Sequence, residues 1–91
     1  MSDIDLIKAA DATLKYIEMI EGVSKPLFLS SIPEELSLEY QKDLLGQIIK
    51  GTLWGEKAHR CFGWAQGALV INGIGDLVVY RMINYCSKHN K

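Results

Sequence analysis

The sequence has few of the residues that build catalytic and metal sites. Its two histidines, His59 and His89, are about 30 residues apart, with no cysteine or acid at ligand spacing, so a zinc site within one chain is not expected. The two cysteines form no CxxC pair, and the glycines form no GxGxxG or Walker pattern. Cys61 follows His59 by two positions, and such a pair points to different sides of a helix. We therefore expect no enzyme, no metal and no cofactor.

A strong excess of charge of one sign is also missing. Ten Lys and Arg stand against 11 Asp and Glu, for a net charge of −1, which gives no general attraction to DNA. The charge is unevenly distributed, because residues 1–45 carry four lysines and nine acids and residues 46–91 carry six bases and two acids. The halves are thus complementary, either within one chain or between chains, and a basic site for a small anion is the third interpretation.

Long apolar runs are absent as well. No stretch approaches the roughly 20 apolar residues that cross a bilayer, and acids stand near the N-terminus where a leader would be basic and apolar. We therefore expect no membrane partner, no signal peptide and a cytoplasmic location. The hydrophobic fraction of 48% with 23% charged residues is typical of a globular protein. Ninety-one residues suffice for one core, so residues 1–91 are expected to form a single helical domain.

The first half of the chain predicts two helices. Ser2 and Asp5 have the spacing of a capping box, and the periodic apolar pattern that follows should stop at Gly22. Residues 23–32 are expected to form an apolar connector that lies on the core. Pro33 begins a helical turn, which either joins the next helix or ends at Ser37.

The second helix of this half is predicted from Leu38 to about Lys50, from its amphipathic pattern. The sequence from Leu53 to Asn72 then predicts a central helix. Only Gln66 is clearly polar between residues 61 and 71, so protein should enclose this helix on nearly every side. Gln66 is expected to form either a helix-crossing hydrogen bond or a ligand contact.

Two glycines of the central helix are four residues apart. Gly63 and Gly67 share one side, where the missing side chains let another backbone approach closely. Each glycine costs about 1 kcal/mol of helix propensity relative to alanine. The pair therefore indicates either tight packing within the monomer or a crossing between subunits in self-association.

The C-terminal part can be interpreted in two ways. Residues 72–75 form a turn, and Asp76 begins a last helix whose inward side is expected to hold Val78, Val79, Met82, Ile83 and Cys86. The fold class is then all-α, a small four-helix bundle-like domain with both cysteines reduced, or joined by a disulfide if the last two helices pack antiparallel. The alternative is α+β, because Asn72-Gly73 between two apolar runs is also typical of a β-hairpin.

The first half of the central helix is the candidate contact site. Lys57, Arg60 and Trp64 have the i, i+3, i+7 spacing of one helix face, and His59 and Gln66 lie on neighbouring sides. A tryptophan beside two cations can stack a base while the cations hold a phosphate. The alternative is structural: Trp64 in the core or an interface, Arg60 paired with an acid of the N-terminal half, and Lys57 solvated.

The same segment carries a resemblance. It is similar to a K-x-H-R-W-x-G-F-x-Q-G-x-L signature, followed by a glycine turn and a last helix with a central arginine. The residues that carry this similarity are Lys57, His59, Arg60, Gly63, Trp64, Gln66, Gly67, Leu69, Gly73, Ile74 and Arg81. The pattern resembles that of small proteins encoded by tailed phages and prophages. Cys61 stands where the signature has tryptophan, and Tyr80 and Asn84 stand where its last helix has charged residues. The resemblance implies a viral accessory protein with no assigned reaction, whose last two helices are joined by the glycine turn.

The expected function follows from apolar surface and from this resemblance. A short chain with so many apolar positions and complementary halves favours self-association, as a homo-oligomer and most simply a dimer. We expect a non-enzymatic phage accessory protein that binds or inhibits a host protein in the host cytoplasm. The alternative is a protein of anti-defence type that sequesters a small anionic nucleotide or cyclic dinucleotide with Lys57, Arg60 and Trp64.

Overall fold

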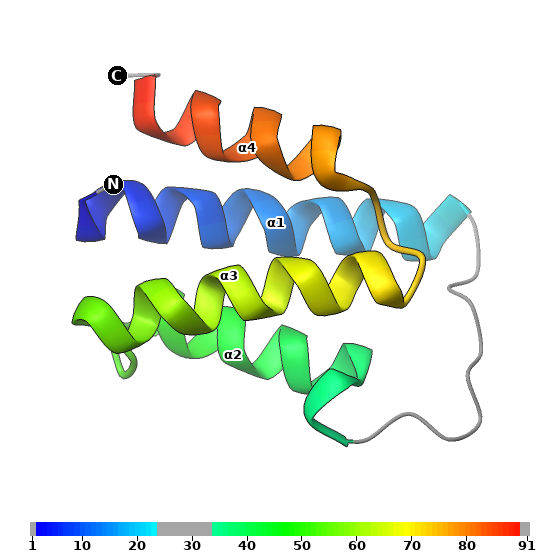
Figure 1. The fold of residues 1–91 in the computed structure, drawn as a ribbon, viewed down its shortest axis with the longest axis horizontal. Coiled ribbons are helices and arrows are strands. Elements are labelled where there is room, and N and C mark those ends of the chain that lie inside the picture. Colours follow the sequence, from blue (N-terminus) through cyan, green and yellow to red (C-terminus); the bar gives the residue numbers. More distant parts are fainter. Residues whose placement is uncertain (1, 24–33, 90–91) are drawn as a thin grey trace.

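The computed structural model describes residues 2–23 and 34–89, and these residues form an all-α domain (Figure 1). Its elements in chain order are α1 (Asp3–Val23), the 3₁₀ turn η1 (Glu34–Leu36), α2 (Leu38–Lys50), α3 (Gly55–Ile71) and α4 (Leu77–His89). The prediction of a small four-helix bundle-like domain is confirmed. The alternative of a hairpin at Asn72-Gly73 is wrong, because the chain after that turn forms α4.

The predicted start of α1 is confirmed and its predicted stop is not. The backbone N–H of Asp5 donates to Ser2 Oγ at 3.1 Å, and the backbone N–H of Ser2 donates to Asp5 Oδ2 at 3.4 Å, as a capping box requires. The hydrogen bond from Ser2 holds the pKa of the Asp5 carboxyl below its ordinary value. At its other end α1 continues through Gly22 to Val23, so the expected stop at Gly22 is wrong.

Ser37 separates η1 from α2. Its backbone is extended, with φ −71° and ψ 155°, and its Oγ accepts a hydrogen bond from the backbone N–H of Tyr40 at 3.2 Å. This is the geometry of an N-cap, so η1 ends before Ser37 and does not join α2. At the other end Gly51, with φ +82°, closes α2 in a left-handed conformation. The predicted apolar connector, residues 23–32, lies outside the described residues apart from Val23, which ends α1.

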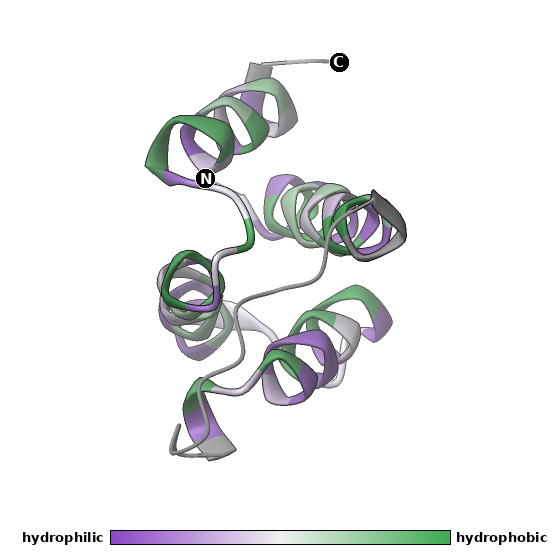
Figure 2. Cartoon of the chain, turned by 90° about the vertical axis from the view of Figure 1, so that its right-hand side faces the viewer, coloured by the Kyte–Doolittle hydropathy of each residue, from purple (hydrophilic) through white to green (hydrophobic). Residues whose placement is uncertain are grey.

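Helices α1, α2 and α3 pack against one another, and α4 packs mainly on α1. Figure 1 shows α1 running between α4 and α3, and Figure 2 shows α4 at the outer edge of the bundle. The core holds apolar side chains from every helix and from the turn before α4. Its buried members are Leu6, Ala9, Ala10, Ile17, Leu45, Ile48, Ala58, Phe62, Ala65, Leu69, Ile74 and Tyr80.

A tight turn anchored in the core joins α3 to α4. Ile74 is fully buried, and its backbone N–H donates to the carbonyl of Leu69 at 2.9 Å. Gly73 and Gly75 both have positive φ, of 79° and 74°, a backbone conformation that residues with side chains rarely adopt. Asp76 then accepts a hydrogen bond from the backbone N–H of Val79 at 2.9 Å and so caps α4. These residues turn the chain back along α1.

The expectation that protein encloses α3 on nearly every side is wrong. Trp64 and Ile71 are 52% and 51% exposed, and Gly63 and Gly67 are exposed as well. The reason is the position of α4, which packs on α1 and leaves the outer side of α3 uncovered by the described residues. The apolar pattern of α3 therefore extends beyond the side that the described residues cover.

The predicted inward side of α4 is also wrong in part. Val78, Met82 and Cys86 are exposed, whereas Val79 and Ile83 are half-buried. Tyr80 takes an inward position instead and is almost fully buried, with its hydroxyl donating to the carbonyl of Ile74. A buried tyrosine is tolerated there because its polar atom has a partner.

Candidate functional site

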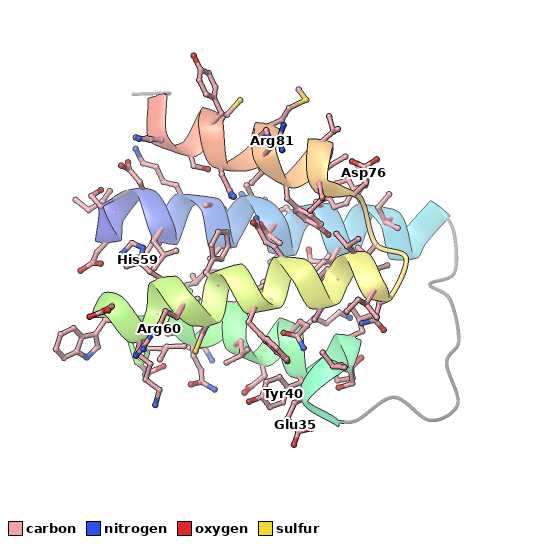
Figure 3. The ribbon with its side chains drawn as sticks, in the orientation of Figure 1. Glu35, Tyr40, His59, Arg60, Asp76 and Arg81 are labelled. Carbon is pink, nitrogen blue, oxygen red and sulfur yellow. The ribbon has the colours of Figure 1, made fainter. Side chains whose placement is uncertain are left out.

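Seven exposed residues occupy one side of α3. They recur at three- and four-residue intervals, so they form a single face that runs the length of the helix. We call this surface the glycine face, and its members are Glu56, Lys57, Arg60, Gly63, Trp64, Gly67 and Ile71. Figure 3 shows Arg60 pointing away from α1, whereas His59 lies toward it. Five of the seven candidate residues from the sequence are therefore on one continuous surface.

The two glycines at the centre of this face have open space beside them. A Cβ atom built on Gly63 or Gly67 would find no heavy atom within 4 Å, apart from nearby residues of its own helix. Among residues 2–23 and 34–89, the structure therefore shows none of the tight packing within the monomer that was one of the two explanations offered by the sequence. The propensity cost of about 1 kcal/mol per glycine is not offset by a contact among residues 2–23 and 34–89.

The indole of Trp64 is held by one hydrogen bond, and its ring is exposed to solvent. Its indole Nε1–H donates to the backbone carbonyl of Glu35 at 3.2 Å, which ties η1 to α3. Half of the side chain nevertheless remains exposed. Lys57 and Arg60 are exposed on the same face, nearer the start of the helix. An aromatic ring with its polar atom already bonded presents a rigid apolar surface to a partner.

His59 makes a structural contact. Its Nε2 lies 3.0 Å from Asp3 Oδ1, so it joins the first turns of α3 and α1. Gln66 is buried next to the glycine face, on the side of α3 that faces α1 and α4. Its amide donates to Thr13 Oγ1 of α1 at 3.3 Å and to Asn84 Oδ1 of α4 at 3.0 Å, and it accepts from Asn84 Nδ2 at 2.9 Å. Of the two roles expected for Gln66, the structure shows the helix-crossing hydrogen bond.

A groove of about 340 Å³ lies between α3 and α4. Gly63 and Gly67 form its α3 wall, and Leu77 and Arg81 are on its α4 wall. The Gln66 side chain, bonded to Asn84, also lines it. The sequence analysis did not predict this groove. Its walls come from two helices, and a local sequence pattern does not indicate how two helices are placed relative to each other. The only available signal was the pair of glycines facing outward.

A second group that sequence reasoning missed lies on α4. Val78, Met82 and Tyr85 are 61%, 62% and 65% exposed, and they are separated by four and three residues. We call these three residues the α4 ridge. Their 4–3 spacing is that of contact positions between paired helices, a signal that the sequence analysis assigned in part to the core.

The described residues do not assemble a metal or redox centre. No group of three or more His, Cys, Asp or Glu side chains among them is placed to hold a metal ion. Cys61 and Cys86 are free thiols, so the alternative of a disulfide between them is wrong. Within the same ranges, no helix combines the length and hydropathy needed to span a membrane.

Comparisons with known proteins add no relative. The chain matched no protein-family model, no curated protein and no solved structure. The functional argument therefore depends on the glycine face, the groove beside it and the α4 ridge.

Proposed function

We propose that the chain is a small, non-enzymatic phage accessory protein that acts by protein–protein contact, binding or inhibiting a host protein in the host cytoplasm as a homo-oligomer. The observation that carries the binding role is the glycine face of α3. The phage assignment is supported by the resemblance of the signature from Lys57 onward. The binding role can be tested without knowing the host partner in advance.

The glycine face has the shape and composition that suit a helix of another protein. Gly63 and Gly67 leave a smooth strip at its centre, where a second backbone can approach without meeting a side chain. Trp64 and Ile71 stand beside the strip, half-exposed, and supply apolar area that a partner would remove from water. A glycine strip flanked by large apolar side chains is thus a docking surface for a partner helix.

Charge at the start of this face indicates the chemistry of the partner. Lys57 and Arg60 are both exposed there, beside one acid, Glu56. Two cations against one anion favour a partner segment with acidic residues next to its apolar ones. Such complementarity raises the association rate and excludes basic competitors. We therefore expect the host segment to be an amphipathic helix with an acidic edge.

The test is capture from bacterial lysate by tagged chains, with quantitative mass spectrometry of the captured proteins. Gly67→Leu fills the strip with a good helix former, so the fold should persist while host capture is lost. Gly46→Leu is the matched control: Gly46 also lies within a helix, α2, and has open space beside its missing Cβ. Equal capture by both variants, with helical circular dichroism retained, would remove the glycine face as the binding surface.

One observation favours the alternative of a nucleotide-sequestering protein. Lys57, Arg60 and Trp64 are exposed on one side of α3, where a base and a phosphate could be bound together. A ligand at 100 times its dissociation constant adds about 2.7 kcal/mol of stability, which a thermal-shift screen of nucleotides and cyclic dinucleotides detects. A shift that Arg60→Ala abolishes would support sequestration. A flat screen would count against it and leave host-protein binding as the function.

A further inference from the structure

Helix α4 presents much of its apolar surface outward. The α4 ridge, Val78, Met82 and Tyr85, is more than 60% exposed at each position. The inward side holds the polar Asn84 and Ser87, which are half-buried and hydrogen-bonded within the bundle. Figure 2 shows α4 at the outer edge of the bundle with much of its ribbon coloured as hydrophobic. Val78 and Met82, two of the three members of the ridge, are left open to solvent by the part of the chain that the structure describes.

The ridge stands between two hollows. On one flank is the groove between α3 and α4, of about 340 Å³, with Leu77 and Arg81 on its α4 wall. On the other flank a hollow of about 410 Å³ lies between α4 and α1, with Met82 and Cys86 on its α4 wall and Lys8 and Ala12 on its α1 wall. Because both flanks are hollow, the outward side of α4 stands clear of α1 and α3 and can meet the same side of a second copy, as the isologous interface of a two-fold dimer requires.

We propose that α4 pairs antiparallel with α4 of a second copy, with Met82 at the centre. This inference depends on the self-association stated in the proposed function and gives it a surface and a register. It assigns contact between copies to the α4 ridge in place of Gly63 and Gly67, and it leaves the glycine face of α3 to the host protein.

The apolar area agrees with a dimer of moderate affinity. Side chains of this size expose on the order of 150–250 Å² when free, so the ridge offers roughly 400 Å² of each copy, within the range of the largest patch on a typical monomer. Leu77, Cys86 and the walls of the two hollows extend it toward the roughly 600–1,000 Å² per partner that stable dimers bury. The ridge is therefore large enough to hold two copies together once its flanks are included.

Charge favours the antiparallel direction. Asp76 stands at the start of α4 and Lys88 in its last turn, each six positions from Met82. Antiparallel pairing centred on Met82 brings Asp76 of one copy to the level of Lys88 of the other, twice by symmetry, with both side chains outside the contact because they lie about 120° around the helix from Met82. Parallel pairing would put like charges and like helix ends together. Arg81 lines the groove toward α3 and so lies at the edge of the ridge.

Cysteine cross-linking tests the register directly. Val78 and Cys86 are each four positions from Met82, so the proposed pairing sets residue 78 of one copy opposite Cys86 of the other. With Cys61→Ala as background, Val78→Cys should yield a covalent dimer under mild oxidation, since a disulfide needs Cα atoms about 4.4–6.8 Å apart. Without that change, the two Cys86 residues lie about 12 Å apart along the helices and should stay reduced.

The outcomes separate the alternatives. A Cys86–Cys86 cross-link in the background chain would mean parallel pairing and overturn the proposal, as would no cross-link in either chain. Sedimentation gives an independent readout: Met82→Glu should weaken the dimer at least tenfold, because it places an acid at the two-fold centre. The matched control is Met19→Glu on α1, where the methionine is 58% exposed, and it should leave the dimer unchanged.

Failure of this inference differs from failure of the proposed function. A wild-type chain that is monomeric at micromolar concentration removes self-association altogether and the α4 pairing with it. A dimer that survives Met82→Glu but dissociates with Gly67→Leu keeps self-association and moves it to the glycine face. Host-protein capture is a separate measurement on Gly67→Leu and its Gly46→Leu control, and it reports on host contact alone where Gly67→Leu leaves the dimer intact.

Discussion

The side-chain amides of Gln66 and Asn84 form a reciprocal pair between α3 and α4. Gln66 Nε2 donates to Asn84 Oδ1 at 3.0 Å, and Asn84 Nδ2 donates to Gln66 Oε1 at 2.9 Å. Gln66 also reaches Thr13 of α1 at 3.3 Å, so one buried side chain connects three helices. Because α4 otherwise packs mainly on α1, this pair holds the base of the groove at a defined width.

Replacing Gln66 with leucine should destabilise the fold. The change leaves the Asn84 amide without its partner on α3, and a buried polar group left without a partner costs about 1–3 kcal/mol. We expect the free energy of unfolding, measured by urea titration, to fall by that amount. The double variant Gln66→Leu/Asn84→Leu should recover part of the loss, because neither amide is then stranded. A single variant with the wild-type urea midpoint would show that the pair contributes nothing.

Alanine at Gly63 or Gly67 should stabilise the isolated chain. Alanine is favoured over glycine inside a helix by about 1 kcal/mol, and the added Cβ meets no neighbouring atom at either position. Thermal unfolding of Gly63→Ala, Gly67→Ala and the double variant should therefore show raised midpoints, with roughly additive gains. A lowered midpoint in dilute solution would mean that the glycines do pack against something in the folded chain.

Alanine at Gly75 should have the opposite effect. This glycine has φ +74°, and a Cβ there would lie 2.9 Å from Tyr16 Cε2 and 3.1 Å from Tyr80 Cζ. The left-handed conformation costs a residue with a side chain about 1–2 kcal/mol, and overpacking against the buried ring of Tyr80 and the half-buried ring of Tyr16 adds about 1–3 kcal/mol. We expect a clear loss of stability in the same thermal assay. Equal midpoints for Gly75→Ala and wild type would refute the tight turn.

Most of the helical framework could be predicted from local patterns. The capping box at Ser2 and the span of α2 from Leu38 depend on residues within one or two turns of each other, so the sequence contains them directly. The choice between hairpin and helix after Asn72 was harder, because the turn signal is shared. In the structure, two residues favour the helix: Asp76 caps α4, and Ile74 anchors the turn in the core.

Local patterns could not predict which sides of α3 and α4 the rest of the bundle covers. An apolar pattern states that a residue gains by burial, but not whether its own chain or another molecule buries it. Ile71, in the stretch expected to be enclosed, and Met82, expected on the inward side of the last helix, are both exposed. The partners of Gln66 lie 53 and 18 positions away in the sequence. Helical spacing alone does not identify contacts at such separations.

The hydroxyl of Tyr80 should make stability depend on alkaline pH. Tyr80 is almost fully buried, and its hydroxyl donates to the carbonyl of Ile74. Burial, with smaller contributions from Tyr16 and Asp76, raises the pKa of this phenol well above its ordinary value of 10.0. In the unfolded chain the same group titrates near 10. The folded state therefore binds this proton more tightly than the unfolded state does.

The sign of the effect follows from linkage. Below pH 10 both states hold the proton and the stabilisation is complete, whereas above pH 10 the unfolded chain releases it first and the free energy of unfolding falls. Tyr80→Phe removes this titration, so its urea midpoint should fall less steeply between pH 10 and 11.5 than that of wild type. The variant starts lower, because it lacks the hydrogen bond to Ile74, and the difference between the two chains should narrow as pH rises. Parallel curves over that range would mean that the Tyr80 hydroxyl titrates alike in the folded and unfolded states. That result would contradict the effect expected from its packing against Tyr16 and its hydrogen bond to Ile74.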